Sequence, residues 1–232
     1  FGLGWYAVDR HADPIPCTYR QARPAWHDLN LRNISAKVIT PVLFAHVRAT
    51  TSGQCVSEAT CHPFRAGRYL WMHNGGVGGY GTVRRTLLAG LDDACFDYAQ
   101  SNGPSDSSLC FAIFLNQLRK TMGNRQSSTP VGVDKTTQAV AVGGSPDAAA
   151  KASTANGPPG CGSCTETNTV EYCGFDGDLP VCTPDQLRER LEETILIIKA
   201  AAEEAGVTEM SLLNFVVSDG NALVATRYVI NS

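Results

Sequence analysis

Two short apolar stretches that end in polar residues constrain the fold of this chain most. Residues 38–49 run to Arg48, and residues 68–73 lead into the pair Asn74 and Gly75. Apolar runs of this length are typical of buried strands. Functional side chains are concentrated where a rigid element ends. We therefore predict two buried strands whose ends carry a functional site.

The residue types at these ends predict a specific chemistry. The planar guanidinium of Arg48 can bind both oxygens of a substrate carboxylate. The amide of Asn74 and the backbone N–H of Gly75 are the two donors that an oxyanion hole needs. Taken singly, an Asn-Gly pair is most often a turn, and an arginine after a strand usually lies in solvent. Together they predict acyl transfer on a substrate with a free carboxylate.

The remaining pattern predicts strands at both ends of the chain and helices between them. Strands are expected at residues 1–8, 17–23, 212–217 and 223–229, the last two as a hairpin. Helices are expected at residues 27–37, 79–90, 106–122 and 184–206. Ser105 is the expected N-cap of the third helix, and Thr183 with Gln186 forms a capping box for the fourth.

A segment rich in Ser, Thr, Gly, Pro and Ala interrupts this pattern at residues 125–182. Such a composition buries too little apolar surface to order itself. We expect a disordered surface loop within one domain that spans residues 1–232.

A four-cysteine zinc site would need two closely spaced pairs, and only Cys161 and Cys164 fit, since Cys173 and Cys182 are far apart. We therefore interpret these four cysteines as unpaired thiols that bind no metal.

Composition narrows the class of protein further. The net charge of -3 gives no basic surface for nucleic acid. The chain has no apolar run long enough for a membrane span and no leader segment. The nine cysteines are interpreted as reduced thiols, which predicts a cytoplasmic protein.

A glycine-rich stretch at residues 76–81 satisfies the dinucleotide fingerprint G-x-G-x-x-G, and it follows a strand and precedes a helix. A nucleotide site also needs a second parallel strand that ends in an acidic residue, and Asp97 is too early and poorly placed. We favour close backbone approach around the oxyanion donors as the reason for these glycines, and we expect no cofactor.

Several spaced motifs in one order resemble the class II glutamine amidotransferases, which are N-terminal-nucleophile hydrolases. The central ones are FAHVRATT, CHPF and MHNGG, at residues 44–51, 61–64 and 72–76. Residues 1–6, 24–26, 211–215 and 218–220 also fit. The motifs are most similar to a small, free-standing branch that includes the glutathione-degrading amidotransferase subunit of fungi. The resemblance covers residues 1–124 and about 184–232, and implies an α+β fold, a four-layer αββα sandwich.

The resemblance also implies roles for individual residues. Arg48 would bind the α-carboxylate of a γ-glutamyl group. Asn74 and Gly75 would hold the tetrahedral oxyanion. His46 and His73 match family positions, and we assign them a supporting role without proton transfer.

Asp106 matches the family aspartate that binds the substrate α-ammonium. A place in the first helical turn would keep its carboxylate ionised, as that role requires. On local sequence alone, Asp106 could equally serve only as a helix cap. Relatives commonly carry Glu two residues later, where this chain has Ser108. The substitution removes a second acidic contact.

The family nucleophile is a cysteine at the extreme N-terminus, whose own α-amine is the base. This chain begins at Phe1 and its cysteines are internal. Cys61 and His62 are neighbours in what looks like a strand, so their side chains would point to opposite faces. We therefore expect an inactive fragment that lacks the nucleophile and further C-terminal strands.

The activity implied is hydrolysis of a γ-glutamyl amide through a γ-glutamyl thioester. Glutathione is the leading substrate and glutamine another, with a peptidase-like partner subunit. A γ-glutamyl hydrolase of ergothioneine synthesis is the runner-up. A different class, a catalytically dead scaffold that binds a partner, fits the changed Ser108 and the long insert.

Overall fold

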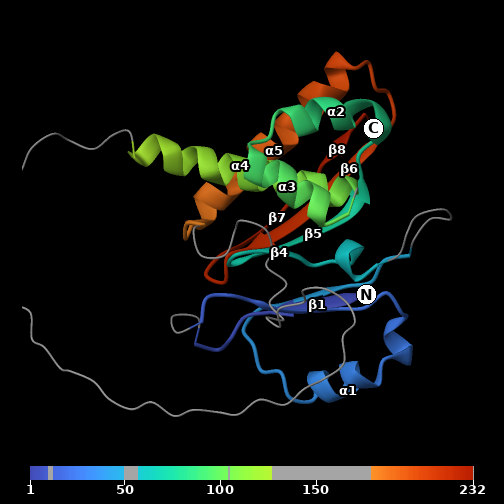
Figure 1. The fold of residues 1–232 in the computed structure, drawn as a ribbon, viewed down its shortest axis with the longest axis vertical. Coiled ribbons are helices and arrows are strands. Elements are labelled where there is room, and N and C mark those ends of the chain that lie inside the picture. Colours follow the sequence, from blue (N-terminus) through green and yellow to red (C-terminus); the bar gives the residue numbers. More distant parts are fainter. Residues whose placement is uncertain (10–12, 50–56, 104, 127–178, 232) are drawn as a thin grey trace, which may run out of the picture.

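The computed structural model describes most of the 232-residue chain (Figure 1). The described residues are 1–9, 13–49, 57–103, 105–126 and 179–231. Residues 127–178 lie outside this part, and so do the predicted disorder of that stretch and the cysteines within it.

The smaller of two sheets is formed near the N-terminus. Its strands are β1 (Gly2–Trp5), β2 (Cys17–Arg20) and β3 (Leu43–His46), in the order β2-β1-β3 with antiparallel pairing. The strands predicted at residues 1–8 and 17–23 are confirmed. The buried strand predicted at residues 38–49 is wrong in extent and burial, because only Leu43–His46 is a strand. It lies at the sheet edge, where Phe44 is buried while Leu43 and Ala45 are exposed.

The larger sheet joins the middle of the chain to its C-terminal part. Its strands are β4 (Phe64–Ala66), β5 (Tyr69–Gly76), β6 (Ser211–Ser218), β7 (Leu223–Ala225) and β8 (Val229–Ile230). The order is β4-β5-β6-β7, with β8 also paired to β6, and every pairing is antiparallel. The C-terminal hairpin is confirmed. Because β5 pairs antiparallel on both sides, it is not part of a dinucleotide-binding βαβ unit.

Four helices cover one face of the larger sheet (Figure 1). They are α2 (Tyr80–Ala89), α3 (Asp93–Ser101), α4 (Asp106–Gln126) and α5 (Pro184–Glu204). The capping box of α5 is confirmed, with Thr183 accepting from the Gln186 N–H and Gln186 from the Thr183 N–H. Helix α3 was not predicted from the sequence; its N-cap is Asp92 and its buried stripe is only three residues long.

The two sheets pack directly on each other. The Tyr6 hydroxyl lies 2.8 Å from the carbonyl oxygens of both Arg68 and Ser218, and Phe44 packs with it between the sheets. At Gly4 the sheets are so close that a Cβ would come within 2.7 Å of the Pro63 ring. A glycine therefore lets the sheets approach at this point.

The predicted four-layer sandwich is established in part. Figure 1 shows the order helices, larger sheet, smaller sheet and then α1 (Leu29–Ser35) on the far side. Helix α1, whose N-cap is Asp28, lies within the helix predicted at residues 27–37 and has no buried residue. The described residues show a mixed fold with two antiparallel sheets and one full helical layer.

Both ends of the predicted insert belong to the fold, which corrects its boundaries. Helix α4 extends through Gln126. Leu179 and Cys182 are buried in the main core, and the Cys182 N–H donates to Asp219 Oδ2 at 3.0 Å. Burial and a hydrogen bond, rather than composition, order these residues.

Candidate active site

A cavity of about 310 Å³ opens where the ends of β3 and β5 meet the start of α4. Every residue predicted for the site lines it, although the residues come from three separate parts of the chain. The lining residues are His46, Val47, Arg48, Ala49, His62, His73, Asn74, Gly75, Asp106 and Ser107. Four of the lining residues were not predicted from the sequence: Val47, Ala49, His62 and Ser107.

Asn74 and Gly75 lie within a β-ladder and not in a turn. Asn74 pairs with Asn214 of β6, and Gly75 pairs with Leu213. The Asn214 amide donates to the Asn74 carbonyl oxygen at 2.8 Å. Gly75 has φ +143°, and a Cβ there would strike the Leu212 carbonyl oxygen. The turn interpretation is therefore excluded, and glycine is required on steric grounds.

Asp106 is more than a helix cap. The N-cap is Ser105, whose hydroxyl oxygen accepts from the Ser108 N–H at 3.1 Å. One carboxylate oxygen of Asp106 accepts from the Ser107 N–H at 2.8 Å, and the other accepts from the Val77 N–H at 3.1 Å, outside the helix. The carboxylate is thus held at the cavity wall by two backbone donors.

Ser108, at the position where the family resemblance implies a glutamate, does not line the cavity. Its hydroxyl is directed at the preceding turn, 2.7 Å from the Gly103 carbonyl oxygen and 2.9 Å from that of Ser105. In the described lining, Asp106 is therefore the acidic side chain.

Three histidines line the cavity, and burial lowers the pKa of each. His73 is buried between a carbonyl oxygen of β6 and the start of α4. The pKa of His62 is lowered to about 2, first by burial and then by His46, whose ring lies 4.4 Å away. Burial also lowers the pKa of His46 and His73. All three imidazoles are therefore neutral at pH 7.

Cys61 and His62 do not form a reactive pair, as expected, although they follow a 3₁₀ turn (Glu58–Thr60) rather than lie within a strand. The Cys61 thiol is buried and directed at the carbonyl oxygens of Gln21 and Ser57, 3.4 Å from each. Neither ring nitrogen of His62 has a hydrogen-bond partner among the described residues.

Two of the glycines after β5, Gly78 and Gly79, allow close packing of the backbone. A Cβ on Gly78 would strike the Glu209 carbonyl oxygen. Gly79 has φ +59°, and a Cβ there would lie 2.7 Å from both methyl groups of Val207. Close approach is found at these two glycines, but it is to residues 207–210 and not around Asn74 and Gly75 as predicted.

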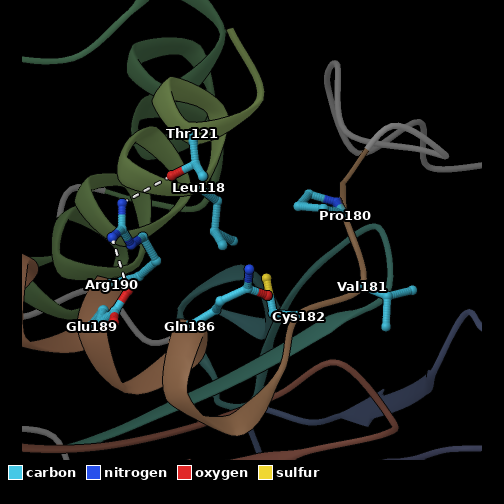
Figure 2. Close-up of a pocket in the computed structure, with 8 residues that line it drawn as sticks. All are labelled: Leu118, Thr121, Pro180, Val181, Cys182, Gln186, Glu189 and Arg190. Carbon is cyan, nitrogen blue, oxygen red and sulfur yellow. Dashed lines mark hydrogen bonds and ion pairs between the residues drawn. The ribbon is translucent and has the colours of Figure 1, made fainter. Parts of the chain in front are cut away.

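A second, smaller cavity of about 80 Å³ lies between α4 and α5 (Figure 2). Figure 2 shows Arg190 directed at Thr121, with which it forms a 2.9 Å hydrogen bond, and it also pairs with Glu189 at 3.4 Å. None of the predicted site residues lines this cavity. It is not a candidate for the chemistry predicted above.

Within residues 1–9, 13–49, 57–103, 105–126 and 179–231, no three His, Cys, Asp or Glu side chains are grouped so as to hold a metal ion. None of the helices in this part is long and apolar enough to span a membrane.

The comparisons with known proteins point to one class. No protein-family model matches the chain. A glutamine aminotransferase class-II domain protein from Silicibacter pomeroyi shares the fold, with a TM-score of 0.59 and 22% identity over 99% of this chain and 66% of that chain. The chain therefore shares the fold of that protein.

The sequence match is to a particular fungal protein. The chain is 30% identical over 234 residues to the probable glutamine amidotransferase DUG3 of Saccharomyces cerevisiae, a match that covers 99% of this chain. The resemblance to class II glutamine amidotransferases predicted from the motifs is confirmed. The chain spans about half, 51%, of the length of this curated relative.

Proposed function

We propose that the protein hydrolyses the amide bond of a γ-glutamyl compound. One observation carries the proposal: Arg48, Asp106 and the pair Asn74 and Gly75 line the same cavity. A γ-glutamyl group presents an α-carboxylate, an α-ammonium and a γ-carbonyl. A guanidinium, a carboxylate and an oxyanion hole are the complementary groups.

The reaction proposed is nucleophilic catalysis by the thiol of an N-terminal cysteine, as the family resemblance implies. The α-amine of that cysteine takes the thiol proton. Sulfur then attacks the γ-carbonyl carbon, and the oxyanion is held by the Asn74 amide and the Gly75 N–H. The C–N bond breaks as the leaving amine receives the proton, which leaves a γ-glutamyl thioester. Water hydrolyses the thioester to glutamate and the free thiol.

The proposed substrate is glutathione, with glutamine as a second γ-glutamyl compound. Arg48 and Asp106 would bind only the glutamyl end, so the cavity groups named here place little demand on the leaving amine. Similarity to the yeast protein, a probable glutamine amidotransferase, supports chemistry at a γ-glutamyl amide. We further propose that the protein is cytoplasmic and that it assembles with a peptidase-like partner subunit. We also propose that its fold is the complete αββα sandwich.

Labelling of the full-length protein with a glutamine-like diazoketone tests the proposal. Mass spectrometry of peptides should find the label on an N-terminal cysteine, and excess glutamine should block it. Hydrolysis of glutathione and glutamine should be lost in proportion to labelling. A protein with no label, or with label on an internal thiol such as Cys61, would contradict the proposal and favour a scaffold.

A further inference from the structure

The imidazole of His73 connects the two halves of the cavity wall. Its Nε2 lies 2.9 Å from the Leu212 carbonyl oxygen, and its Nδ1 lies 2.9 Å from the Ser107 hydroxyl oxygen. A carbonyl oxygen only accepts hydrogen bonds, so Nε2 carries the proton. In the neutral ring Nδ1 is then an acceptor, and the Ser107 hydroxyl donates to it.

Each end of this connection meets a group of the proposed γ-glutamyl site. The Leu212 carbonyl is the one that packs directly against Gly75. At the other end, the Ser107 N–H donates to Asp106 Oδ1 at 2.8 Å. Both His73 and Ser107 are buried, with 3% and 5% of their surfaces exposed. Ring contact with Phe215, 4.8 Å between centroids, further restrains the imidazole.

We propose that His73 is a positioning residue that acts through Ser107 to hold the Asp106 carboxylate at a fixed place relative to Gly75. The inference rests on the proposed function, because it assigns Asp106 to the α-ammonium of the substrate. His73 touches neither the reacting atoms nor the ammonium. Its effect is to set the distance between the ammonium-binding group and the oxyanion donors, to which hydrolysis is sensitive.

Two substitutions separate this role from general support of the fold. His73→Gln places an amide that can still donate to the Leu212 carbonyl but removes the acceptor for Ser107. Ser107→Ala removes the hydroxyl and leaves the histidine intact. If the two residues act as one unit, the double variant should resemble each single variant. Ser101→Ala, at an exposed position on α3, is the matched control.

The experiment measures kcat/KM of the full-length protein for glutamine and for glutaramate, the analogue without the α-ammonium. Both variants should lower the preference for glutamine at least tenfold, through the KM for glutamine, and change the values for glutaramate less than threefold. An unchanged preference, or equal losses on both substrates, would overturn the inference and leave the proposed function intact. A wild-type protein that hydrolyses neither glutamine nor glutathione would overturn both.

Discussion

At the scale of single residues, the predicted groups converge as the motifs indicated. Arg48, Asn74, Gly75 and Asp106 line one cavity, and the sequence identified them by side-chain chemistry and by family motif. His62 and Ser107 were not predicted as site residues. Nothing in a sequence marks a buried histidine that faces a cavity, because that depends on two sheets packing together.

Arg48→Lys tests the carboxylate-binding role. A point charge replaces a bidentate fork, so the KM for glutamine should rise at least tenfold while kcat changes little. Steady-state kinetics of the full-length protein measures both values. Arg188→Lys, on the exposed surface of α5, is the control, and an unchanged KM in Arg48→Lys would refute the assignment.

Asn74→Ala tests the oxyanion hole. Loss of one donor should remove roughly 3 kcal/mol of transition-state stabilisation, a fall in kcat on the order of a hundredfold, with KM nearly unchanged. Asn33→Ala, on the exposed surface of α1, provides a comparison in the same assay. A kcat at the wild-type level would mean that Asn74 does not contact the oxyanion.

At the scale of elements, α4 and α5 were predicted within a few residues, whereas α3 was not predicted and the edge strand β3 is shorter than predicted. Thr183 and Gln186 define the start of α5 through a capping box, and such local contacts can be predicted from the residue types and their spacing. The burial of β3 depends on its place at the edge of a sheet. The apolar run at residues 38–49 therefore predicts a longer and more buried strand than the structure has. The buried stripe of α3 is too short to give a recognisable helical periodicity of apolar residues.

Alanine substitutions of two glycines test whether β5 requires a glycine at position 75 on steric grounds. Gly75→Ala should lower the free energy of unfolding, because φ is +143° and a Cβ would strike Leu212. Gly81→Ala, in α2 with open space around it, should instead stabilise by up to about 1 kcal/mol. Urea denaturation measures both, and equal effects of the two changes would contradict this account.

At the scale of the whole molecule, the sequence predicted the order of strands and helices but not how the layers meet. The contact between the sheets depends on Tyr6, Gly4 and Phe44, which lie far from their partners in sequence. The antiparallel pairing of β5 excluded a nucleotide fold that its glycine motif alone would allow.

Stability should fall as the pH is lowered from 7 to 5. The unfolded chain takes up a proton on each histidine below about pH 6.5, whereas burial lowers the pKa of His62 in the folded state to about 2. The unfolded state thus binds more protons, and the lowered pKa values of His46 and His73 act in the same direction. Urea denaturation across this range measures the slope.

His62→Gln should reduce that slope, and His27→Gln, at an exposed position, is the comparison. A free energy of unfolding that is constant or rises toward pH 5 would contradict the burial of neutral imidazoles.

Calorimetric binding of glutamate tests most directly whether the cavity is a γ-glutamyl site. Wild-type protein should bind glutamate at least tenfold more tightly than glutarate, which lacks the ammonium, or 4-aminobutyrate, which lacks the α-carboxylate. Asp106→Asn should no longer distinguish glutamate from glutarate but should still reject 4-aminobutyrate. Equal affinity of the wild-type protein for all three ligands would contradict the assignment of Arg48 and Asp106 to one site.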